Sequence, residues 1–382
     1  MKSELRSLCS YAKGKVSVDT LSKRNYVSTE NMLPNKGGIV DSGALPSAQY
    51  TQQYIKGDIL VSNIRPYFKK IWMADDDGGC SNDVLVFRAE RACDSTFLYY
   101  VLANDEFFNY ASATAKGTKM PRGDKTAIMQ YEVPCFDLET QLRIGKLLRC
   151  IDYRIAINKK INDNLQQQAY AYFVRLFVEN ADPTWRIGTI SDLGTVVGGG
   201  TPSKSKSEYY IENGIAWITP KDLSVDKSKF IAHGENDISE LGYRNSSATM
   251  MPAGTVLFSS RAPIGYIAIA SNDVTTNQGF KSVVPHPEIG TPFVYYFLIH
   301  NLPLIESKAS GSTFKEVSGS VMKSVEAVIP DGNTIAKFNE FCRPIFAMQE
   351  KLEQENRKLA EMRDSLLPLL MNGEIDVADI DA

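Results

Sequence analysis

The sequence has no long apolar segment. No run of apolar residues in the 382-residue chain reaches the roughly 18 residues that a membrane-spanning helix requires. The first residues, MKSELRSLCS, also lack the apolar centre of a secretory signal peptide. We therefore expect a protein with no membrane partner.

Metal-binding patterns are also missing. Histidine is scarce, and its positions lie far apart in the sequence: His233, His286 and His300. The 6 cysteines are scattered and form no CxxC pair. Structural zinc sites use closely spaced Cys and His ligands, so we expect no metal site and reduced cysteine thiols.

The motifs of several enzyme classes are absent or isolated. An amino-methyltransferase needs an Asn/Asp-Pro-Pro-aromatic tetrad, and many hydrolases need a GxSxG turn; neither occurs. The glycines Gly198–Gly200 precede Thr-Pro-Ser, which indicates a loop rather than a cofactor-binding helix. The nuclease-like triplet Glu306-Ser307-Lys308 has only Glu288 as a nearby upstream acid, and we interpret it as a solvated helix end. We predict no catalytic residue.

The composition indicates a soluble globular chain with more than one domain. Hydrophobic residues make up 43% and charged residues 23%, which is ordinary for soluble proteins. A chain of 382 residues is too long for one hydrophobic core. The formal net charge of −3 does not indicate nucleic-acid binding, but a local basic face matters more than the total.

A long amphipathic helix is predicted near the C-terminus, over residues 335–370. Its apolar residues recur in steps of 3 or 4, which is the heptad period of a two-stranded coiled coil. Glu355 fills the one polar slot of the series. A seam of this kind needs a partner helix. The predicted seam residues are Ile345, Met348, Leu352, Leu359, Met362 and Leu366.

An internal repeat supplies that partner. GDILVSNIRP (57–66) resembles GTVLFSSRAP (254–263), and YVSTENML (26–33) resembles WITPKDLS (217–224). The offset of roughly 190 to 197 residues indicates a duplicated fold. The first half also closes with a predicted long helix, over residues 138–178, in which Asn158, Asn162 and Asn164 are the polar register residues expected in a coiled coil. Its predicted seam residues are Ile144, Leu148, Ile151, Ile155, Ile161 and Leu165.

Each half begins with short strands and helices. In the first half we expect strands at 58–63, 70–73 and 83–87, and helices at 95–104 and 105–113. In the second half we expect strands at 214–219, 255–259, 265–270 and 279–284, and helices at 291–300 and 302–309.

The two long helices are predicted to pair with each other in an antiparallel rod. About 30 seam residues at ~1.5 Å rise give a rod of roughly 45 Å, which is close to 13 base pairs of DNA at ~3.4 Å each. Two different heads at a fixed separation suggest a bipartite, asymmetric DNA target. The alternative is that each helix packs on its own domain.

Basic residues in loops are the candidate DNA contacts. In the first half they are Arg65, Lys69, Lys70, Lys116, Lys119, Arg122 and Lys125. In the second half they are Lys204, Lys206, Lys221, Lys227, Lys229, Arg244, Arg261, Lys281 and Lys315, and the hydroxyl residue Ser312 is a further candidate phosphate contact. The alternatives are plain solvated loops, core packing for Tyr67 and Phe68, and a carboxylate partner for Arg261.

Six segments of the second half carry a resemblance to a known family. They are GGGTPSKSKSEYY (198–210), IAWITPKDLS (215–224), LFSSRAPIGYIAIA (257–270), TTNQGFKSV (275–283), ASGSTFKEVS (309–318) and LAEMRDSLLPLLMNGEI (359–375). The chain resembles the DNA-specificity subunits of type I restriction–modification systems. The first half departs from this pattern, with KGKVSVDTLSKR (13–24) in place of GGGTPS.

The resemblance implies an α+β fold with two target-recognition domains, related by internal duplication and separated by two long antiparallel coiled-coil helices. The implied segments are domain 1 at 1–136, spacer helix 1 at 137–180, domain 2 at 181–331 and spacer helix 2 at 332–382.

The resemblance further implies a subunit without catalysis or cofactor of its own, because S-adenosylmethionine would bind a methyltransferase partner. The implied partners are double-stranded DNA, two methyltransferase subunits and a translocating restriction subunit, in the cytoplasm of a bacterium or archaeon. The rival hypothesis is a coiled-coil scaffold with two protein-binding heads and no DNA role.

Overall fold

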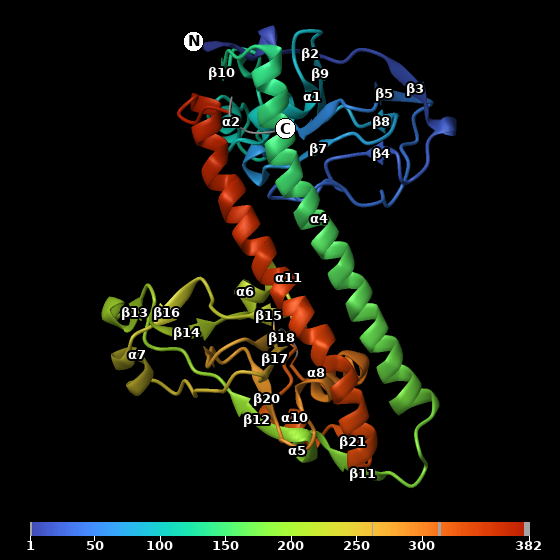
Figure 1. The fold of residues 1–382 in the computed structure, drawn as a ribbon, viewed down its shortest axis with the longest axis vertical. Coiled ribbons are helices and arrows are strands. Elements are labelled where there is room, and N and C mark those ends of the chain that lie inside the picture. Colours follow the sequence, from blue (N-terminus) through green and yellow to red (C-terminus); the bar gives the residue numbers. More distant parts are fainter. Residues whose placement is uncertain (1, 262, 312–314, 378–382) are drawn as a thin grey trace. The chain divides into compact units, whose positions relative to one another are not determined.

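Two long helices occupy the positions that the repeat predicts. In the computed structural model, which describes residues 2–261, 263–311 and 315–377, α4 spans Leu138–Val174 and α11 spans Gly332–Asn372 (Figure 1). A π-helical turn, Arg175–Glu179, follows α4 directly. The chain divides into two compact units: Met1–Ile155 with Arg357–Ala382, and Ala156–Asn356. Each long helix therefore contributes residues to both units.

The first unit contains two four-stranded sheets and a two-stranded ribbon. One sheet has the order β2 (Cys9–Tyr11), β9 (Val84–Ala89), β6 (Ile59–Ser62) and β7 (Ile71–Met73). The other has the order β3 (Lys15–Ser17), β5 (Tyr50–Tyr54), β8 (Gly78–Cys80) and β4 (Tyr26–Val27). The ribbon pairs β1 (Lys2–Glu4) with β10 (Glu132–Pro134). Buried Ile59, Val61 and Phe87 belong to the largest core cluster of this unit.

Three short helices complete the first unit. They are α1 (Ser95–Ala103), α2 (Asp105–Ala113) and α3 (Lys125–Ile128). Asp94, Asn104 and Asp124 precede them, and each side chain accepts a hydrogen bond from a backbone N–H of the first turn. These caps satisfy donors that a helix start leaves without an intrahelical partner.

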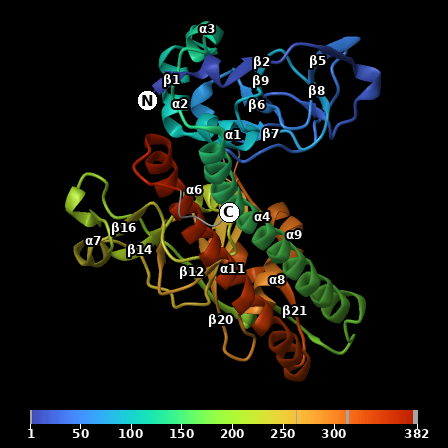
Figure 2. The ribbon, with the colours of Figure 1, turned by 45° about the horizontal axis from the view of Figure 1, so that its top comes forward.

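The second unit repeats this plan. Its larger sheet has the order β12 (Gly194–Gly198), β20 (Lys281–Pro285), β17 (Val256–Ser260), β18 (Ile264–Ala270) and β15 (Phe230–Ile231). Its smaller sheet has the order β13 (Tyr210–Ile211), β16 (Asn236–Ile238), β14 (Ile215–Ile218) and β19 (Thr275–Thr276). A ribbon pairs β11 (Arg186–Thr189) with β21 (Glu326–Ile329). The helices are α5 (Ile190–Leu193), α6 (Pro220–Val225), α7 (Glu240–Arg244), α8 (Thr291–His300), α9 (Leu302–Ser307) and α10 (Gly319–Ser324) (Figure 2).

The duplication predicted from the sequence is confirmed at the level of strand order. The order β2-β9-β6-β7 of the first unit matches β12-β20-β17-β18 of the second. The helices α1 and α2 correspond to α8 and α9, and each half ends with a ribbon strand followed by a long helix. The smaller sheets differ: β5 pairs with β8 in the first unit, whereas its counterpart β16 pairs with β14. The predicted strands and helices fall within a few residues of the observed ones.

The long helices both pair with each other and pack on the domains. In the second unit, the Asn158 amide donates to the Asn356 side chain at 3.0 Å, and the Asn162 amide donates to Glu353 at 2.9 Å. Residue numbers rise on α4 as they fall on α11, so the helices are antiparallel. In the first unit, Leu148 of α4 and Leu367 of α11 belong to the same buried cluster as the sheet and α1. The two packing modes weighed from the sequence therefore coexist.

The seam differs in part from the predicted one. Ile144, Leu148, Ile151, Ile345 and Leu352 are buried, and Ile155, Leu165, Leu359 and Leu366 are half-buried. The prediction is wrong for three residues, whose side chains are 42%, 48% and 51% exposed: Ile161, Met348 and Met362.

Polar residues take the places of the exposed seam candidates. The buried stripe of α11 passes through Cys342, Ile345, Gln349 and Leu352 in steps of three and four. Gln349 is only 1% exposed and lies where apolar patterning would place Met348. A heptad pattern read from apolar residues alone selects the methionine, because the contacts that bury the glutamine come from distant parts of the chain.

Contacts with Lys229 explain why Gln349 is buried. Lys229 lies immediately before β15 and is 6% exposed, so the prediction that it contacts DNA is wrong. Its ammonium donates to Gln166 Oε1 at 2.9 Å and Gln349 Oε1 at 2.8 Å, and it lies 3.6 Å from the ring centre of Phe346. The carboxylate of Glu353 accepts the backbone N–H groups of Lys229 and Phe230 at 2.9 and 3.0 Å. One polar cluster thus joins β15, α4 and α11 within the second unit.

None of the helices, as far as the chain is described, is long and apolar enough to cross a membrane. Within those same residues no group of three His, Cys, Asp or Glu side chains could hold a metal ion.

The burial of Lys229 predicts a pH-dependent stability. Burial lowers the pKa of Lys229 to about 7, against 10.5 for an ordinary lysine. Between these values the unfolded chain binds more protons than the folded chain, so the free energy of unfolding should rise with pH, by about 1.4 kcal/mol per pH unit at most. The substitution Lys229→Met should remove this rise. Urea titrations of both proteins between about pH 7 and 9 measure the difference.

Lys227→Met is the matched control, because Lys227 is an exposed lysine in the same loop. It should keep the pH slope of the unmodified chain. Equal slopes for the unmodified chain and Lys229→Met would show that Lys229 is not held neutral in the folded state.

Candidate nucleic-acid interface

In the first unit, a β-bridged loop brings the two predicted basic clusters together. Lys116 and Arg122 exchange backbone hydrogen bonds of 2.8 and 2.9 Å, and Arg122 also bridges Ile64. The N–H of Arg65 donates to the carbonyl of Pro121 at 2.8 Å. The loop at 116–122 therefore lies directly against the segment that follows β6.

The side chains of this loop are exposed cations. Lys116 pairs with Asp124 at 2.5 Å and Arg122 pairs with Asp83 at 3.0 Å, with the cationic side chains 82% and 57% exposed. The hydrogen bond from Lys116, together with two backbone N–H groups, lowers the pKa of Asp124. Lys119 is exposed and has no recorded partner among the described residues; Lys125, at the start of α3, is exposed as well. Exposed ion pairs contribute little to stability, so a phosphate can displace the carboxylates at little cost.

The turn between β6 and β7 carries the other predicted cluster. A short 3-10 helix, Pro66–Phe68, forms its tip. Lys69 and Lys36 both pair with Asp105 of α2 at 2.8 Å. Burial would raise the pKa of Asp105, but the hydrogen bonds from the two lysines outweigh it and hold that pKa below its usual value. Lys69 thus anchors the turn on α2.

Lys70 and the aromatic residues of the turn have distinct environments. The Lys70 ammonium donates to the carbonyl of Thr29 at 2.6 Å, and burial lowers its pKa. Tyr67 and Phe68 are 51% and 38% exposed. The alternative that these aromatics belong to the core is therefore wrong.

The second unit repeats the backbone pairing with different side chains. Ser310 exchanges backbone hydrogen bonds of 3.0 and 2.9 Å with Glu316, which also bridges Arg261. The Arg261 guanidinium and the Lys281 ammonium both lie 3.5 Å from the Glu316 carboxylate. Arg261 thus has the carboxylate partner that was considered for it, and it remains half-buried. Lys315 is exposed, whereas Ser312 lies outside the described residues.

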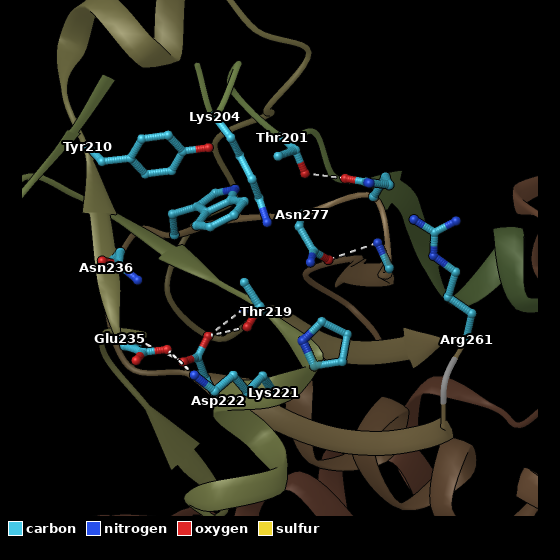
Figure 3. A pocket seen from close by; sticks show the side chains of 14 residues that line it. Thr201, Lys204, Tyr210, Thr219, Lys221, Asp222, Glu235, Asn236, Arg261 and Asn277 are labelled. Atoms are coloured by element: carbon cyan, nitrogen blue, oxygen red, sulfur yellow. Dashed lines mark hydrogen bonds and ion pairs between the residues drawn. The ribbon is translucent and has the colours of Figure 1, made fainter. Parts of the chain in front are cut away.

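A pocket of about 660 Å³ lies beside Arg261 in the second unit (Figure 3). In Figure 3, Lys204 projects into it near Asn277, Arg261 lies at one end, and Asp222 and Glu235 lie at the other. It therefore unites three of the predicted cations: Lys204, Lys221 and Arg261. The lining residues are Thr201, Lys204, Tyr210, Trp217, Thr219, Pro220, Lys221, Asp222, Glu235, Asn236, Arg261, Asn277, Gln278 and Gly279.

The carboxylates of the pocket are engaged. Lys221 pairs with Glu235 at 2.5 Å, and this hydrogen bond raises the pKa of Lys221. Asp222 caps α6 by accepting the N–H and hydroxyl of Thr219 at 2.7 and 2.6 Å. Lys204 is exposed and has no recorded partner in the part of the chain that the structure describes. Lys204 is therefore free to meet an anion.

Sequence reasoning missed the aromatic and amide groups of the pocket. The indole N–H of Trp217 donates to the carbonyl of Gly200 at 2.9 Å. A Cβ at Gly200 would lie 2.4 Å from the backbone nitrogen of Ala248, so the third glycine is required by close packing. Asn277 and Gln278 lie in TTNQGFKSV, one of the segments that carried the resemblance, and that position is the signal that could have identified them.

Lys281, Lys315, Lys206 and Arg244 do not line the pocket, and the last two have partners of their own. Lys206 donates to the hydroxyl of Tyr209 at 3.1 Å and lies 5.0 Å from its ring centre. Arg244, at the end of α7, pairs with Glu240 at 3.6 Å. Both side chains are exposed.

The chemistry of both units fits recognition of a nucleic acid. Lysine and arginine bind phosphates, arginine pairs with guanine edges, and asparagine and glutamine pair with adenine edges. In each unit such groups lie on loops that a sheet and a β-bridged loop hold in place.

Comparisons with known proteins agree with this chemistry. The family model described as "Type I restriction modification DNA specificity domain" matches residues 1–167 and 183–354. The MjaIX specificity subunit of Methanocaldococcus jannaschii is 36% identical over 195 residues, which is 50% of this chain and 44% of that protein. The HindI specificity subunit of Haemophilus influenzae is 25% identical over 438 residues, covering 92% of this chain and 94% of that protein.

A solved structure shows the same fold. The type I restriction–modification S subunit from M. genitalium aligns with a TM-score of 0.63 at 18% identity, over 97% of this chain and 96% of that one. The chain thus belongs to the family of type I restriction–modification DNA-specificity proteins, with one match to the specificity domain in each half.

Proposed function

We propose that this chain is the specificity subunit of a type I restriction–modification complex and that each unit reads one part of a bipartite DNA target. The observation that carries the proposal is the repeated loop pairing, beside which both duplicated domains present cationic side chains: exposed Lys116 and Arg122 in the first and half-buried Arg261 in the second. Because Arg122 stands where the second unit has Glu316, the two parts of the target should differ in sequence.

The long helices are proposed to set the distance between the two parts of the target. The hydrogen bonds of Asn158 and Asn162 with α11 allow only one register of the helix pair, which an apolar seam alone would not. A fixed register gives a fixed spacer length in the DNA.

The proposed partners follow from the family. Two methyltransferase subunits would dock on the chain and supply S-adenosylmethionine chemistry, and a translocating restriction subunit would join the complex. The chain itself would bind DNA and catalyse nothing. This assignment places the protein in the cytoplasm of a bacterium or archaeon.

The rival function is a coiled-coil scaffold with two protein-binding heads. Duplication and paired helices fit it equally well. Two observations favour the DNA-binding function over the scaffold. The chain belongs to a DNA-specificity family, and Lys204, which has no partner among the described residues, lies in a pocket that Asn277 and Gln278 also line.

Selection from a random duplex library tests the proposal. The chain, co-expressed with a methyltransferase subunit, should form a 1:2 complex and enrich one bipartite motif with a fixed spacer at moderate salt. Sequencing of the bound duplexes gives the motif. Enrichment of no motif by a correctly assembled complex would refute the specificity function and favour the scaffold.

Removal of single arginines tests the two faces separately. Arg122→Ala or Arg261→Ala should weaken binding by about 1–3 kcal/mol if the side chain makes a bidentate guanine contact, and should relax the motif at one position only. Arg122→Ala should act on one half-site and Arg261→Ala on the other. Binding titrations on the selected duplex and its single-base variants measure both effects.

Arg6→Ala and Arg186→Ala are the matched controls. Each is an exposed arginine in one carboxylate ion pair, at 2.5 Å for Arg6 with Glu4 and 2.9 Å for Arg186 with Asp192. Neither is among the candidate DNA contacts, so both variants should bind like the unmodified chain. Unchanged affinity and motif in Arg122→Ala and Arg261→Ala would exclude the guanine contacts.

A further inference from the structure

The turn between β6 and β7 exposes two adjacent aromatic side chains. Tyr67 and Phe68 lie at its tip with ring centres 4.8 Å apart, and they are 51% and 38% exposed. Burying a phenylalanine side chain stabilises a protein by about 1.5–3 kcal/mol. Two neighbouring rings, one about half exposed and the other over one third exposed, therefore make this tip a candidate partner-binding surface.

The turn holds these rings in a rigid frame. Arg65 and Lys69, on either side of the 3-10 helix, both have φ values of 50°, in the left-handed region that non-glycine residues seldom adopt. Such a backbone persists only where its surroundings fix it. Here the carbonyls of Phe68 and Lys69 accept the N–H groups of Asn35 and Lys36 at 2.9 and 2.8 Å.

Two further contacts fasten the turn to neighbouring elements. The N–H of Arg65 donates to the carbonyl of Pro121, and Lys69 pairs with Asp105 of α2 at 2.8 Å. The rings are thus presented on a support with little freedom to fold back onto the domain. A preorganised aromatic tip loses little conformational entropy on binding.

The surroundings of the tip are cationic. The neighbouring loop contributes exposed Lys116, Lys119 and Arg122, and the Lys70 ammonium lies 6.0 Å from the ring centre of Phe68. The same loop exposes the side chain of Met120, which is 50% accessible. Apolar tips flanked by Lys and Arg suit a polyanion with a stacked apolar interior, which is the chemistry of duplex DNA.

No described residues of the second unit form an equivalent of this tip. Eight residues, 63–70, separate β6 from β7, whereas three, 261–263, separate the corresponding strands β17 and β18. Arg65 also has no counterpart arginine: alignment of Pro66 with Pro263 places Arg261 opposite Ile64. The aromatic tip is therefore a feature of the first domain alone.

We propose that Tyr67 and Phe68 form a wedge that inserts into the base stack of the half-site bound by the first domain. The inference rests on the proposed DNA-binding function and adds to it a mode of recognition: the first domain would select a base step that unstacks easily, as well as reading base edges. The second domain would bind its half-site without unstacking.

Fluorescence of 2-aminopurine tests the wedge. The complete complex of the chain with its methyltransferase subunits is mixed with duplexes that carry 2-aminopurine at successive positions of the selected target. Apart from any rise at the bases that the methyltransferase subunits flip, fluorescence should rise on binding at one further step, in one half-site only. Phe68→Ala and Tyr67→Ala should abolish this further rise and weaken binding about 10- to 100-fold.

Two comparison variants separate a wedge from a loss of folding. Phe68→Leu keeps an apolar wedge and should retain most of the fluorescence rise. Tyr50→Ala removes a tyrosine that is 54% exposed elsewhere in the same domain, on β5, and should bind like the unmodified chain. Thermal unfolding of all variants should occur at the temperature of the unmodified complex.

The possible outcomes distinguish this inference from the function on which it rests. If the unmodified complex binds its motif, no position other than the flipped bases brightens and the alanine variants bind normally, the wedge is overturned and the specificity function stands. If the unmodified complex has no motif, both fail. If the alanine variants lose methyltransferase subunits instead of DNA affinity, the tip is a protein-docking surface and the wedge is overturned.

Discussion

The carboxylate of Glu353 is the interaction on which the second unit most depends. It accepts the Asn162 amide of α4 and the N–H groups of Lys229 and Phe230 at the start of β15. Burial raises its pKa, so those hydrogen bonds are needed to keep it inside the protein. An apolar seam would tolerate a shift of one helix along the other, but this carboxylate has three partners at fixed positions. This one side chain therefore fixes both the register of α4 against α11 and the position of β15 against α11.

The two proposed recognition surfaces share a backbone pattern and differ in their side chains. In both units the end of a central strand pairs with a loop: the N–H of Gly123 donates to Asn63, and that of Val317 donates to Ser260. These bonds use only main-chain atoms, so they survive almost any change of side chain. The residues that face outward can therefore vary while the loops stay in place. A backbone that holds the loops and side chains that can vary suit a fold whose members bind different targets.

Much of the architecture was predictable from the sequence, because duplication leaves the same glycines, turns and apolar runs at a constant offset. GDILVSNIRP and GTVLFSSRAP correspond to β6 and β17 for that reason. The seam was predictable only in part. Gln349 takes the buried position predicted for Met348 because it accepts a hydrogen bond from Lys229, which lies 120 residues away in the sequence. The exposure of Tyr67 and Phe68 was undecidable from their neighbours in the chain. Trp217 and Asn277 come together through the pairing of β14 with β19, which local patterns do not reveal.

The ribbons β1-β10 and β11-β21 have a consequence for evolution. Each joins the first strand of a domain to its last, with Ser3 opposite Val133 and Ile187 opposite Val328. The chain therefore enters and leaves each domain at neighbouring points. Recombination at two sites in a gene would replace everything between them while leaving the long helices untouched. Under the proposed function, one genetic exchange would give a lineage a new DNA target sequence, without a series of point mutations.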